Sequence, residues 1–449
     1  MNPAFIHTQL AESLADMQLV ADAYRGGAHV NKYLPDPSPS YEIEEVKRAR
    51  YDAYVMRANY YNVTRKTAKA LHGMVFSKYP IVDIDEGIDK SELITVARKA
   101  VMQTLLKGRC GLLADYPLTQ GLTTVAALKA NGHKPKIKLY EAESIINWRV
   151  ENDKLVLVVL KENIVKEDDG FAFKYTERLH VLRLINGVAT SQFYTNNDGQ
   201  WIAGEVVAFR QKDGSPFNEL PFTFIGAENN DSDIDDSPLL DLVKLNLSHY
   251  RNSADYEEAV FITGQPTLFI TGVTDAWQAH YDENPIELGV RTAHLLGTGS
   301  TAEMLQVQPN LLLADAMDRK EKQMVALGAK LIEPSAAAKT ATQANSDTAE
   351  STSILSTLAN NVSDAIVKVA NFCALYIGGR DDNSFSLNTN FMSNKMSPEE
   401  RRQLIAEWQA GAISFDEMRA RLFEDEIATI EDPNEAKELI DAQLSSLNL

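Results

Sequence analysis

The chain has 449 residues, of which 44% are hydrophobic and 24% charged, so it is long enough for two or three domains and wholesale disorder is excluded. Lys and Arg total 44 against 63 Asp and Glu, a formal net charge of −19, which argues against tight wrapping of nucleic acid, because that affinity needs clustered cations. Only two cysteines, Cys110 and Cys373, occur far apart, and we see neither a secretory signal nor a membrane-spanning run; we therefore expect a soluble protein in a reducing compartment, cytosolic or borne on a particle.

The first 226 or so residues predict an α+β domain. Helices are expected at 9–25, at 42–78 with a break near Asn62 or Gly73, and at 91–106, followed by a buried strand at 110–115. Between residues 136 and 210 the hydrophobic period changes to two, and Asn186-Gly187 and Asn197-Asp198-Gly199 are hairpin signals. These patterns predict an antiparallel β meander that follows N-terminal helices.

Residues 237–264 predict a helix that is too polar for an ordinary core. Ser237 is expected to cap its start and Pro238 to occupy the first turn. An apolar stripe then fades toward a charged C-terminal half; its members are Leu239, Leu240, Val243 and Leu247. Because buried charges are costly unless they are paired, such a half-apolar, half-charged helix favours a contact between subunits.

The remainder alternates small β elements with helices. Residues 265–308 predict short strands in a small β insertion, 310–328 a helix, and 329–347 an exposed loop rich in Ser, Thr and Ala. A long helix at 348–377, a brief strand at 385–391 and helices from 397 onward complete the chain.

Catalytic constellations are weak. Gly297-Thr298-Gly299 has no βαβ unit around it, and Asp231, Asp233 and Asp235 begin like a calcium loop but lack its Gly and Glu. The eight histidines are scattered, and we find no Walker loop and no zinc-protease motif. We therefore expect no metal, no cofactor and no enzymatic activity.

Several segments resemble the portal proteins of tailed bacteriophages. Residues 237–272, SPLLDLVKLNLSHYRNSADYEEAVFITGQPTLFITG, resemble the portal stem helix entering the clip, with its cluster of Tyr250, Ser253 and Ala254. YVMRANYYNVTRKTAKALHGMVFSKYP at 54–80 and GLLADYP at 111–117 resemble the wing, and SPEERRQLIAEWQAGAISFDEMRARL at 397–422 resembles a portal C-terminus. The resemblance covers most of the chain in the right order, but no single motif is diagnostic.

This resemblance implies a ring, usually of twelve subunits, at one vertex of a capsid. It divides the chain into a wing at 1–236, stem helices at 237–262 and 311–328, a clip at 263–310, a tunnel loop at 329–350, a returning wing helix and strand at 351–396, and a short helical crown at 397–449. The implied partners are further copies of the chain, the terminase large subunit, a head-completion or tail adaptor, the major capsid and scaffold proteins, and double-stranded DNA in passing, with no membrane. The implied location is the virion, with assembly in the host cytoplasm.

Three groups of contact residues follow from this mapping. We expect stem contacts between subunits from Tyr250, Arg251, Asp255 and Glu258. We expect partner contacts in the clip from Trp277, Tyr281, Asp282 and Glu283. We expect transient phosphate contacts in the tunnel loop from Lys330, Lys339, Thr340 and Gln343.

Two other classes of protein stay open. A different head-to-tail adaptor would normally be far shorter and lack paired stem helices. A hydrolase of unrecognised type would show turnover and need not form rings.

Charge reversal of the tunnel-loop lysines gives a first prediction. Replacing Lys330 and Lys339 by Glu is expected to change packaging efficiency while rings still form, because these are the only two cations in that loop. Packaged DNA length and infectivity are the measurements. Unchanged values for both would contradict the assignment.

Overall fold

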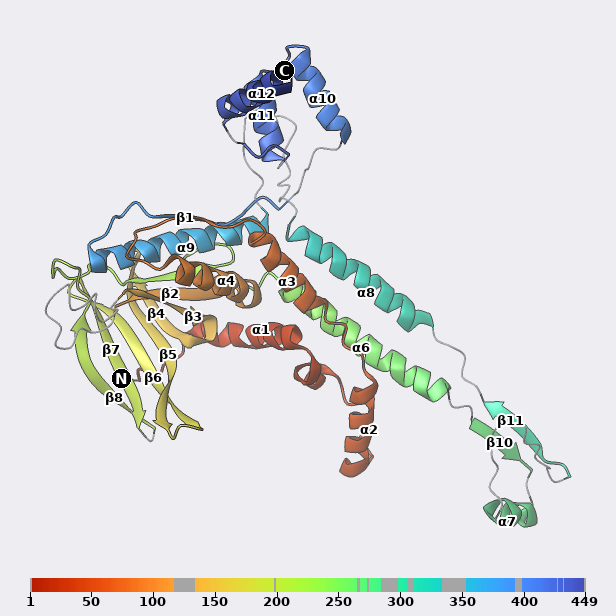
Figure 1. The fold of residues 1–449 in the computed structure, drawn as a ribbon. Coiled ribbons are helices and arrows are strands. Elements are labelled where there is room, and N and C mark those ends of the chain that lie inside the picture. The colour runs from red at the N-terminus through yellow and green to blue at the C-terminus, as the bar shows by residue number, and fades with distance from the viewer. Residues whose placement is uncertain are drawn as a thin grey trace. The chain divides into compact units, whose positions relative to one another are not determined.

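A computed structural model describes the chain at residues 2–116, 134–197, 199–264, 267–272, 274–283, 298–305, 311–332, 353–391, 398–425, 427–430 and 432–447. It is a mixed α and β structure that divides into two compact units, Met1–Thr389 and Asn390–Leu449 (Figure 1). No helix in the described ranges is long and apolar enough to cross a bilayer.

The N-terminal helices of the first unit follow the expected order. They are α1 (Thr8–Arg25), two 3₁₀ turns (Gly27–His29 and Asn31–Tyr33), α2 (Glu44–Arg57), α3 (Val63–Val75) and α4 (Lys90–Lys107). The predicted stretch 42–78 is thus two helices, and the break lies at Asn62 as expected. Asn62 accepts a hydrogen bond from the Arg65 backbone N–H and so caps α3, which is why the break occurs there.

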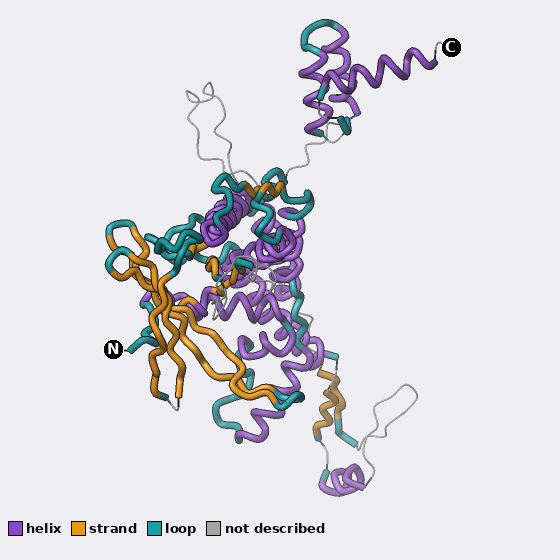
Figure 2. Tube along the Cα trace, turned by 60° about the vertical axis from the view of Figure 1, so that its left-hand side comes forward, coloured by secondary structure: helices purple, strands orange, loops and turns teal. Residues whose placement is uncertain are grey.

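Two antiparallel sheets replace the single predicted meander (Figure 2). The smaller has the order β3-β2-β9, from β2 (Arg109–Asp115), β3 (Lys136–Glu141) and β9 (Phe222–Gly226). The larger is a meander of β4 (Ile145–Glu151), β5 (Lys154–Asp168), β6 (Phe173–Ile185), β7 (Val188–Asn197) and β8 (Gln200–Ala208). Strands β4 and β9 were not predicted, and the pairing of β2 with β9 joins residues more than 100 positions apart, which periodicity cannot reveal.

The hairpin predictions fit this larger sheet. Asn186 and Gly187 both have positive φ, 51° and 78°, and join β6 to β7. Asn197 pairs with Gln200 across the next turn, where Gly199 has φ 89°. Two central residues with φ above zero are the conformation that a tight hairpin requires.

The core of the first unit forms where α4 and α9 (Ile354–Ile377) pack on each other and on the β3-β2-β9 sheet. Helix α9 begins at Ile354 rather than 348, because the Ser353 side chain accepts from the Ser356 N–H and caps it there. It ends at Gly378 in the left-handed conformation, as predicted. Strand β12 (Ser384–Ser386) then pairs with β1 (Ile81–Asp83). The sequence did not predict β1.

One arginine is buried within this core. Arg109 is 1% exposed, and its guanidinium carbon lies 4.1 Å from the Trp148 ring centroid and 3.9 Å from that of Phe224. Burial lowers the pKa of Arg109 to about 9, although nearby aspartates such as Asp231 favour the charged form. The two aromatic faces supply the cation–π attraction that such a buried cation needs.

Helix α6 (Leu240–Thr263) is the predicted central helix, but it begins three residues later than its predicted cap. Pro238 and Leu239 form a turn, and Ser237 instead donates to the Leu105 carbonyl at the end of α4 and accepts from the Leu239 N–H. Gly108 makes this junction possible, since a Cβ there would lie 1.9 Å from the Asp235 carbonyl oxygen. The start of α6 is therefore anchored to the end of α4.

The insertion between α6 and α8 (Leu311–Lys330) contains a helix that the sequence did not predict. Strands β10 (Thr267–Thr271) and β11 (Thr301–Leu305) pair as a two-stranded ladder, and α7 (Asp275–Glu283) lies between them in sequence. Thr298 and Gly299 form a turn before β11, so the part of the Gly297-Thr298-Gly299 pattern that the structure describes serves as a turn.

The second unit contains α10 (Pro398–Gln409), α11 (Phe415–Glu424) and α12 (Pro433–Leu447). Ser414 and Glu417 form a reciprocal capping box at the start of α11, and the Trp408 and Phe415 rings meet edge to face. Its buried residues are Met418, Ala428 and Ala436. The helical C-terminus expected from residue 397 is thus a small helical unit of its own.

Candidate subunit interface

The N-terminal half of α6 is held inside the first unit by one buried amide. Asn246 is fully buried, and its Oδ1 accepts from the hydroxyls of Tyr60 (3.0 Å) and Thr64 (2.9 Å) and from the Thr64 N–H (3.3 Å). Its Nδ2 donates to the Tyr61 carbonyl at 2.9 Å. One side chain thereby provides hydrogen-bond partners for polar groups of the segment that leads into α3. These bonds fix α6 against that segment.

Polar contacts then pair α6 with α8. The Lys320 ammonium donates to the Ser248 carbonyl at 3.0 Å, and His249 Nε2 lies 3.3 Å from a Glu321 carboxylate oxygen. Burial lowers the pKa of Lys320, with the cations Arg251 and Arg319 adding to that effect. The two helices lie side by side in Figure 1, and Met324 is the one hydrophobic α8 residue buried. This pairing therefore depends more on polar contacts than on a continuous apolar core.

The four predicted stem residues all have partners within their own chain. The Tyr250 hydroxyl donates to Asn31 Oδ1 (3.2 Å) and Arg251 Nε to the Tyr33 carbonyl (3.2 Å). Asp255 accepts from the Tyr54 hydroxyl at 2.6 Å, and Glu258 forms an ion pair with Arg57. These bonds tie α6 to α2 and to the 31–33 turn, which a pattern on α6 alone could not show. A role for the same four residues between subunits stays a prediction.

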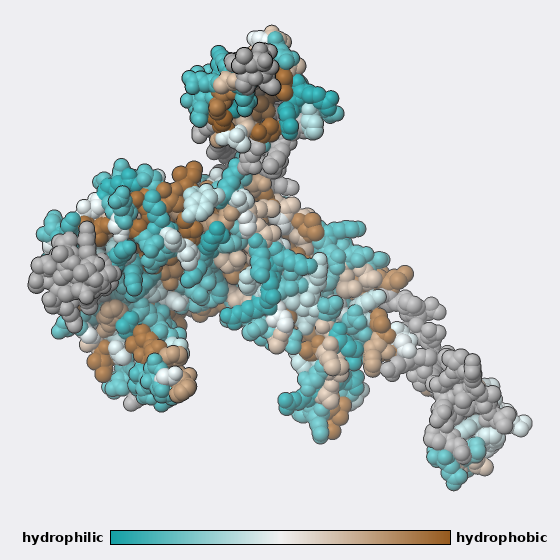
Figure 3. Space-filling model, viewed as in Figure 1, coloured by the Kyte–Doolittle hydropathy of each residue, from teal (hydrophilic) through white to brown (hydrophobic). Residues whose placement is uncertain are grey.

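Exposed apolar side chains lie on other parts of α2, α6 and α8. Ile262 near the end of α6 is 55% exposed, and Val325 on α8 is 72% exposed. Other exposed apolar residues on α2, α6 and α8 are Val46, Met56, Val260, Phe261, Leu311 and Leu312. Figure 3 shows such brown residues among teal ones over this part of the molecule. The apolar run AVFI at 259–262 is the sequence signal that could have revealed this exposed end of α6, and it was missed.

The predicted clip residues lie together on α7. The Trp277 and Tyr281 rings are 5.5 Å apart between centroids and both are half-buried, whereas Asp282 and Glu283 are exposed. None of the α7 side chains is fully buried. An aromatic pair beside two carboxylates has the chemistry of a protein contact, and that role stays a prediction.

The predicted tunnel loop is described only at its beginning. Lys330 is the last residue of α8 and is exposed. Lys339, Thr340 and Gln343 lie outside the described residues.

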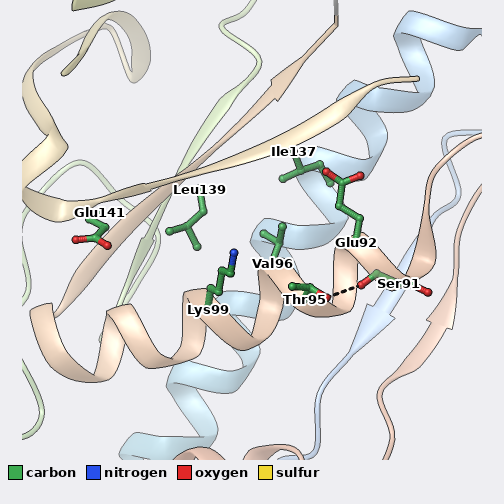
Figure 4. A pocket seen from close by; sticks show the side chains of 8 residues that line it. All are labelled: Ser91, Glu92, Thr95, Val96, Lys99, Ile137, Leu139 and Glu141. Carbon is green, nitrogen blue, oxygen red and sulfur yellow. Dashed lines mark hydrogen bonds between the residues drawn. The ribbon is translucent and has the colours of Figure 1, made fainter. Parts of the chain in front are cut away.

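A shallow hollow of about 610 Å³ lies between α4 and β3 (Figure 4). Val96, Ile137 and Leu139 form its apolar side, and Lys99 extends into it from α4. The Thr95 hydroxyl donates to the Ser91 carbonyl at 2.9 Å and is therefore engaged in its own helix. This arrangement lacks the paired nucleophile and base that covalent catalysis needs.

The carboxylates of the acidic run before α6 accept hydrogen bonds from backbone N–H groups of the same segment. Asp235 accepts from the Glu228 N–H at 2.7 Å, and Asp231 accepts from the Asp233 N–H at 2.8 Å. Burial raises the pKa of Asp235. Within the described ranges no three His, Cys, Asp or Glu side chains are grouped so as to hold a metal ion.

A Glu-His-Ser row on β5, β6 and β7 has the spacing of a charge relay. His180 Nε2 lies 2.7 Å from the Ser191 hydroxyl, and His180 Nδ1 lies 3.8 Å from Glu162 Oε1. His180 is only 1% exposed, however, and Ser191 is buried on a central strand that pairs with β6 on one side and β8 on the other. We interpret the row as a buried polar network.

The electrostatics of this row agree with that interpretation. Burial lowers the pKa of His180 to about 4 despite the nearby Glu162 carboxylate. Burial alone would raise the pKa of Glu162, but hydrogen bonds from Tyr140 and Arg178 outweigh it and lower the value. A histidine that stays neutral until such low pH is poorly suited as a general base near neutrality.

A family model described as a domain of unknown function (DUF4055) matches residues 238–377, from the start of α6 to the end of α9. No curated protein matches the chain. A chain from the neck of an empty GTA particle computed with C6 symmetry shares 14% identity at a TM-score of 0.42, covering 86% of this chain and 95% of that one.

Two further solved structures give similar values. A chain from the virion of a native gene transfer agent (GTA) particle shares 14% identity at a TM-score of 0.41, over 92% of this chain and 98% of that one. A chain from the neck of a native GTA particle computed with C12 symmetry also shares 14% at 0.41, over 88% and 97%. At this identity and these TM-scores the likeness carries no conclusion about function.

Removing the buried amide should loosen α6. Asn246→Ala is expected to lower the free energy of unfolding by about 2–4 kcal/mol, because it removes the hydrogen-bond partner of the Thr64 hydroxyl, the Thr64 N–H and the Tyr61 carbonyl. The Tyr60 hydroxyl keeps the Ala23 carbonyl as an acceptor. Asn252→Ala, the same substitution at a partly exposed position of the same helix, is the matched control and should cost less than about 1 kcal/mol. Chemical denaturation measures both. Equal effects would contradict the role of Asn246.

The buried histidine predicts a stability loss on acidification. The pKa of His180 is about 4 in the folded protein and 6.5 in the unfolded chain, so protonation favours the unfolded chain. The contribution of neutral His180 to the free energy of unfolding is therefore complete above pH 6.5 and declines as the pH falls toward 4. The slope is at most about 1.4 kcal/mol per pH unit. His180→Gln should flatten the dependence of melting temperature on pH in this window. An unchanged profile would show that His180 does not titrate there.

Proposed function

We propose that this chain is a portal subunit, which forms a ring-shaped channel at one vertex of a phage-like capsid. Double-stranded DNA would be packaged and released through the channel. The terminase large subunit would dock on the ring during packaging, and a head-completion or tail adaptor would bind it afterwards. Hydrolysis of ATP would belong to the motor, so the subunit itself is not an enzyme.

The observation that carries this proposal is the paired helices α6 and α8, which flank the small insertion with β10, β11 and α7. The pair is joined by polar contacts at Ser248 and His249, while apolar side chains at Ile262 and Val325 stay exposed. A lone chain gains nothing from exposed apolar groups along a helical pair. Copies related by rotation would cover them, and a repeated head-to-tail contact forms a ring where its rotation closes.

The charge of the chain is compatible with a DNA channel. A net charge of −19 repels phosphate over most of the surface, so DNA could pass without being held tightly. On this proposal the half-buried aromatic pair and the exposed acidic side chains of α7 would form the docking site for partner proteins, and the segment after Lys330 would approach the DNA.

The alternative of a head-to-tail adaptor predicts a different behaviour in solution. An adaptor that assembles on an existing ring would stay monomeric when purified, whereas a portal subunit forms rings alone. The alternative of a hydrolase finds its best candidate in Ser191, and the enclosure of His180 argues against it.

Imaging of the purified full chain tests the proposal. Negative-stain top views should show rings with an axial hole, and mass photometry should show one high-mass species. Ile262→Glu together with Val325→Glu should shift the population to monomers while leaving the melting temperature of the monomer nearly unchanged, since both side chains are exposed in a single chain.

Phe173→Glu is the matched control for this experiment. Phe173 lies on β6 and is 55% exposed, so it also places a charge at an exposed apolar position, but away from α6 and α8. We expect it to leave the rings intact. Uniform monomers of the unmodified chain at high concentration would overturn the proposed function.

A further inference from the structure

The positive charges of this acidic chain are concentrated in one region. Residues 53–140 contain 14 Lys and Arg against 6 Asp and Glu, whereas the rest of the chain contains 30 against 57. Within that region, the 30 residues 53–82 contain five cations and no acid at all. Such asymmetry suggests a polyanionic partner for this part of the molecule.

The described part of this region brings four cations to one surface. Arg65, Lys66 and Lys69 lie on the exposed side of α3, and Arg98 lies on α4, which packs against α3. We refer to these four residues as the α3–α4 basic surface. The Arg98 guanidinium carbon lies 4.3 Å from the centroid of the Phe76 ring, so Arg98 continues the basic side of α3 across the helix pair.

Contacts hold three of the four cations in place without neutralising them. Arg65 donates to the carbonyls of Tyr24 and Arg25, which close α1, and the Lys66 ammonium lies 4.5 Å from the Tyr61 ring centroid. None of the four forms an ion pair with another residue in the described ranges. By contrast, other cations such as Lys107 and Arg178 pair with carboxylates.

We propose that the α3–α4 basic surface binds the phosphate backbone of double-stranded DNA. Three cations within five residues of one helix span about 6 Å along its axis, and duplex DNA carries one charge per about 1.7 Å, so several phosphates come within reach at once. Acids that lie more than about 8 Å from these cations reduce the attraction little, because charges at that separation are largely screened at physiological salt.

This inference rests on the proposed function only for the identity of the polyanion. In a portal, the chain meets DNA at high concentration, and the basic surface would hold it where the remaining acidic surface repels it. The rival occupant is an acidic surface of a second copy of the chain.

Binding of a fluorescent duplex of about 30 base pairs to the full chain, measured by anisotropy across a salt series, tests the inference. Lys66→Glu together with Lys69→Glu should weaken binding at least tenfold at low salt. The slope of log affinity against log salt is negative, and its magnitude should decrease by about 2, since two phosphate contacts are lost. Lys66→Gln together with Lys69→Gln should change the slope in the same direction without adding acids.

A charge-matched control separates this surface from net charge. Lys154→Glu with Lys174→Glu changes the net charge equally on β5 and β6, and should leave affinity and slope near those of the unmodified chain. Failure of the unmodified chain to bind DNA, or equal losses in both double variants, overturns the inference. Loss of rings in the Lys66 and Lys69 variant with unchanged DNA affinity also overturns it and identifies a contact between copies.

The same samples distinguish the two proposals. Rings that bind no DNA through this surface would remove the inference and leave the proposed function standing. DNA binding that depends on Lys66 and Lys69 in a chain that never forms rings would support the inference and remove the proposed function.

Discussion

The placement of α6 depends on the hydrogen bonds of Asn246. A buried amide offers two donors and accepts through one oxygen, and here the Oδ1 and one Nδ2 hydrogen serve Tyr60, Tyr61 and Thr64 while the helix stripe of Val243 and Leu247 packs inside the unit. Apolar packing alone would tolerate small rotations of the helix. The amide network favours one arrangement, because a rotation that moved Asn246 away would leave the Thr64 N–H and the Tyr61 carbonyl without this partner.

Because the N-terminal half of α6 is fixed, it determines which contacts the C-terminal half can make. At Ser248 the helix is held by α8 through Lys320, and beyond Tyr250 it is held by α2 through Tyr54 and Arg57. These contacts use polar groups at the helix flanks. Arg57 also lies over the Phe261 ring, whereas Val260 and Ile262 stay exposed. A helix that is fixed at one end and exposed at the other is suited to bury its exposed residues against another copy. Binding then costs less conformational entropy, because the helix is already ordered within one chain.

The sequence predicted elements where local chemistry determines them. The helix break near Asn62, the turn at Asn186-Gly187 and the stop of α9 at Gly378 each depend on one or two neighbouring residues. Pairings across long separations were not predicted. The β2–β9 ladder, the enclosure of Arg109 by Trp148 and Phe224, and the partners of Tyr250 and Asp255 all join distant segments, and no periodic pattern encodes them.

Under the proposed function, the uneven charge distribution would reconcile an acidic chain with DNA binding. A uniformly acidic protein could neither attract nor orient a duplex, and a uniformly basic one would bind it too tightly for movement. Here the carboxylates exceed the cations by 27 outside residues 53–140, while the four cations of the α3–α4 basic surface form no ion pair among the described residues. Because screening limits each region to its own neighbourhood, attraction and repulsion can act on different parts of one polymer at the same time.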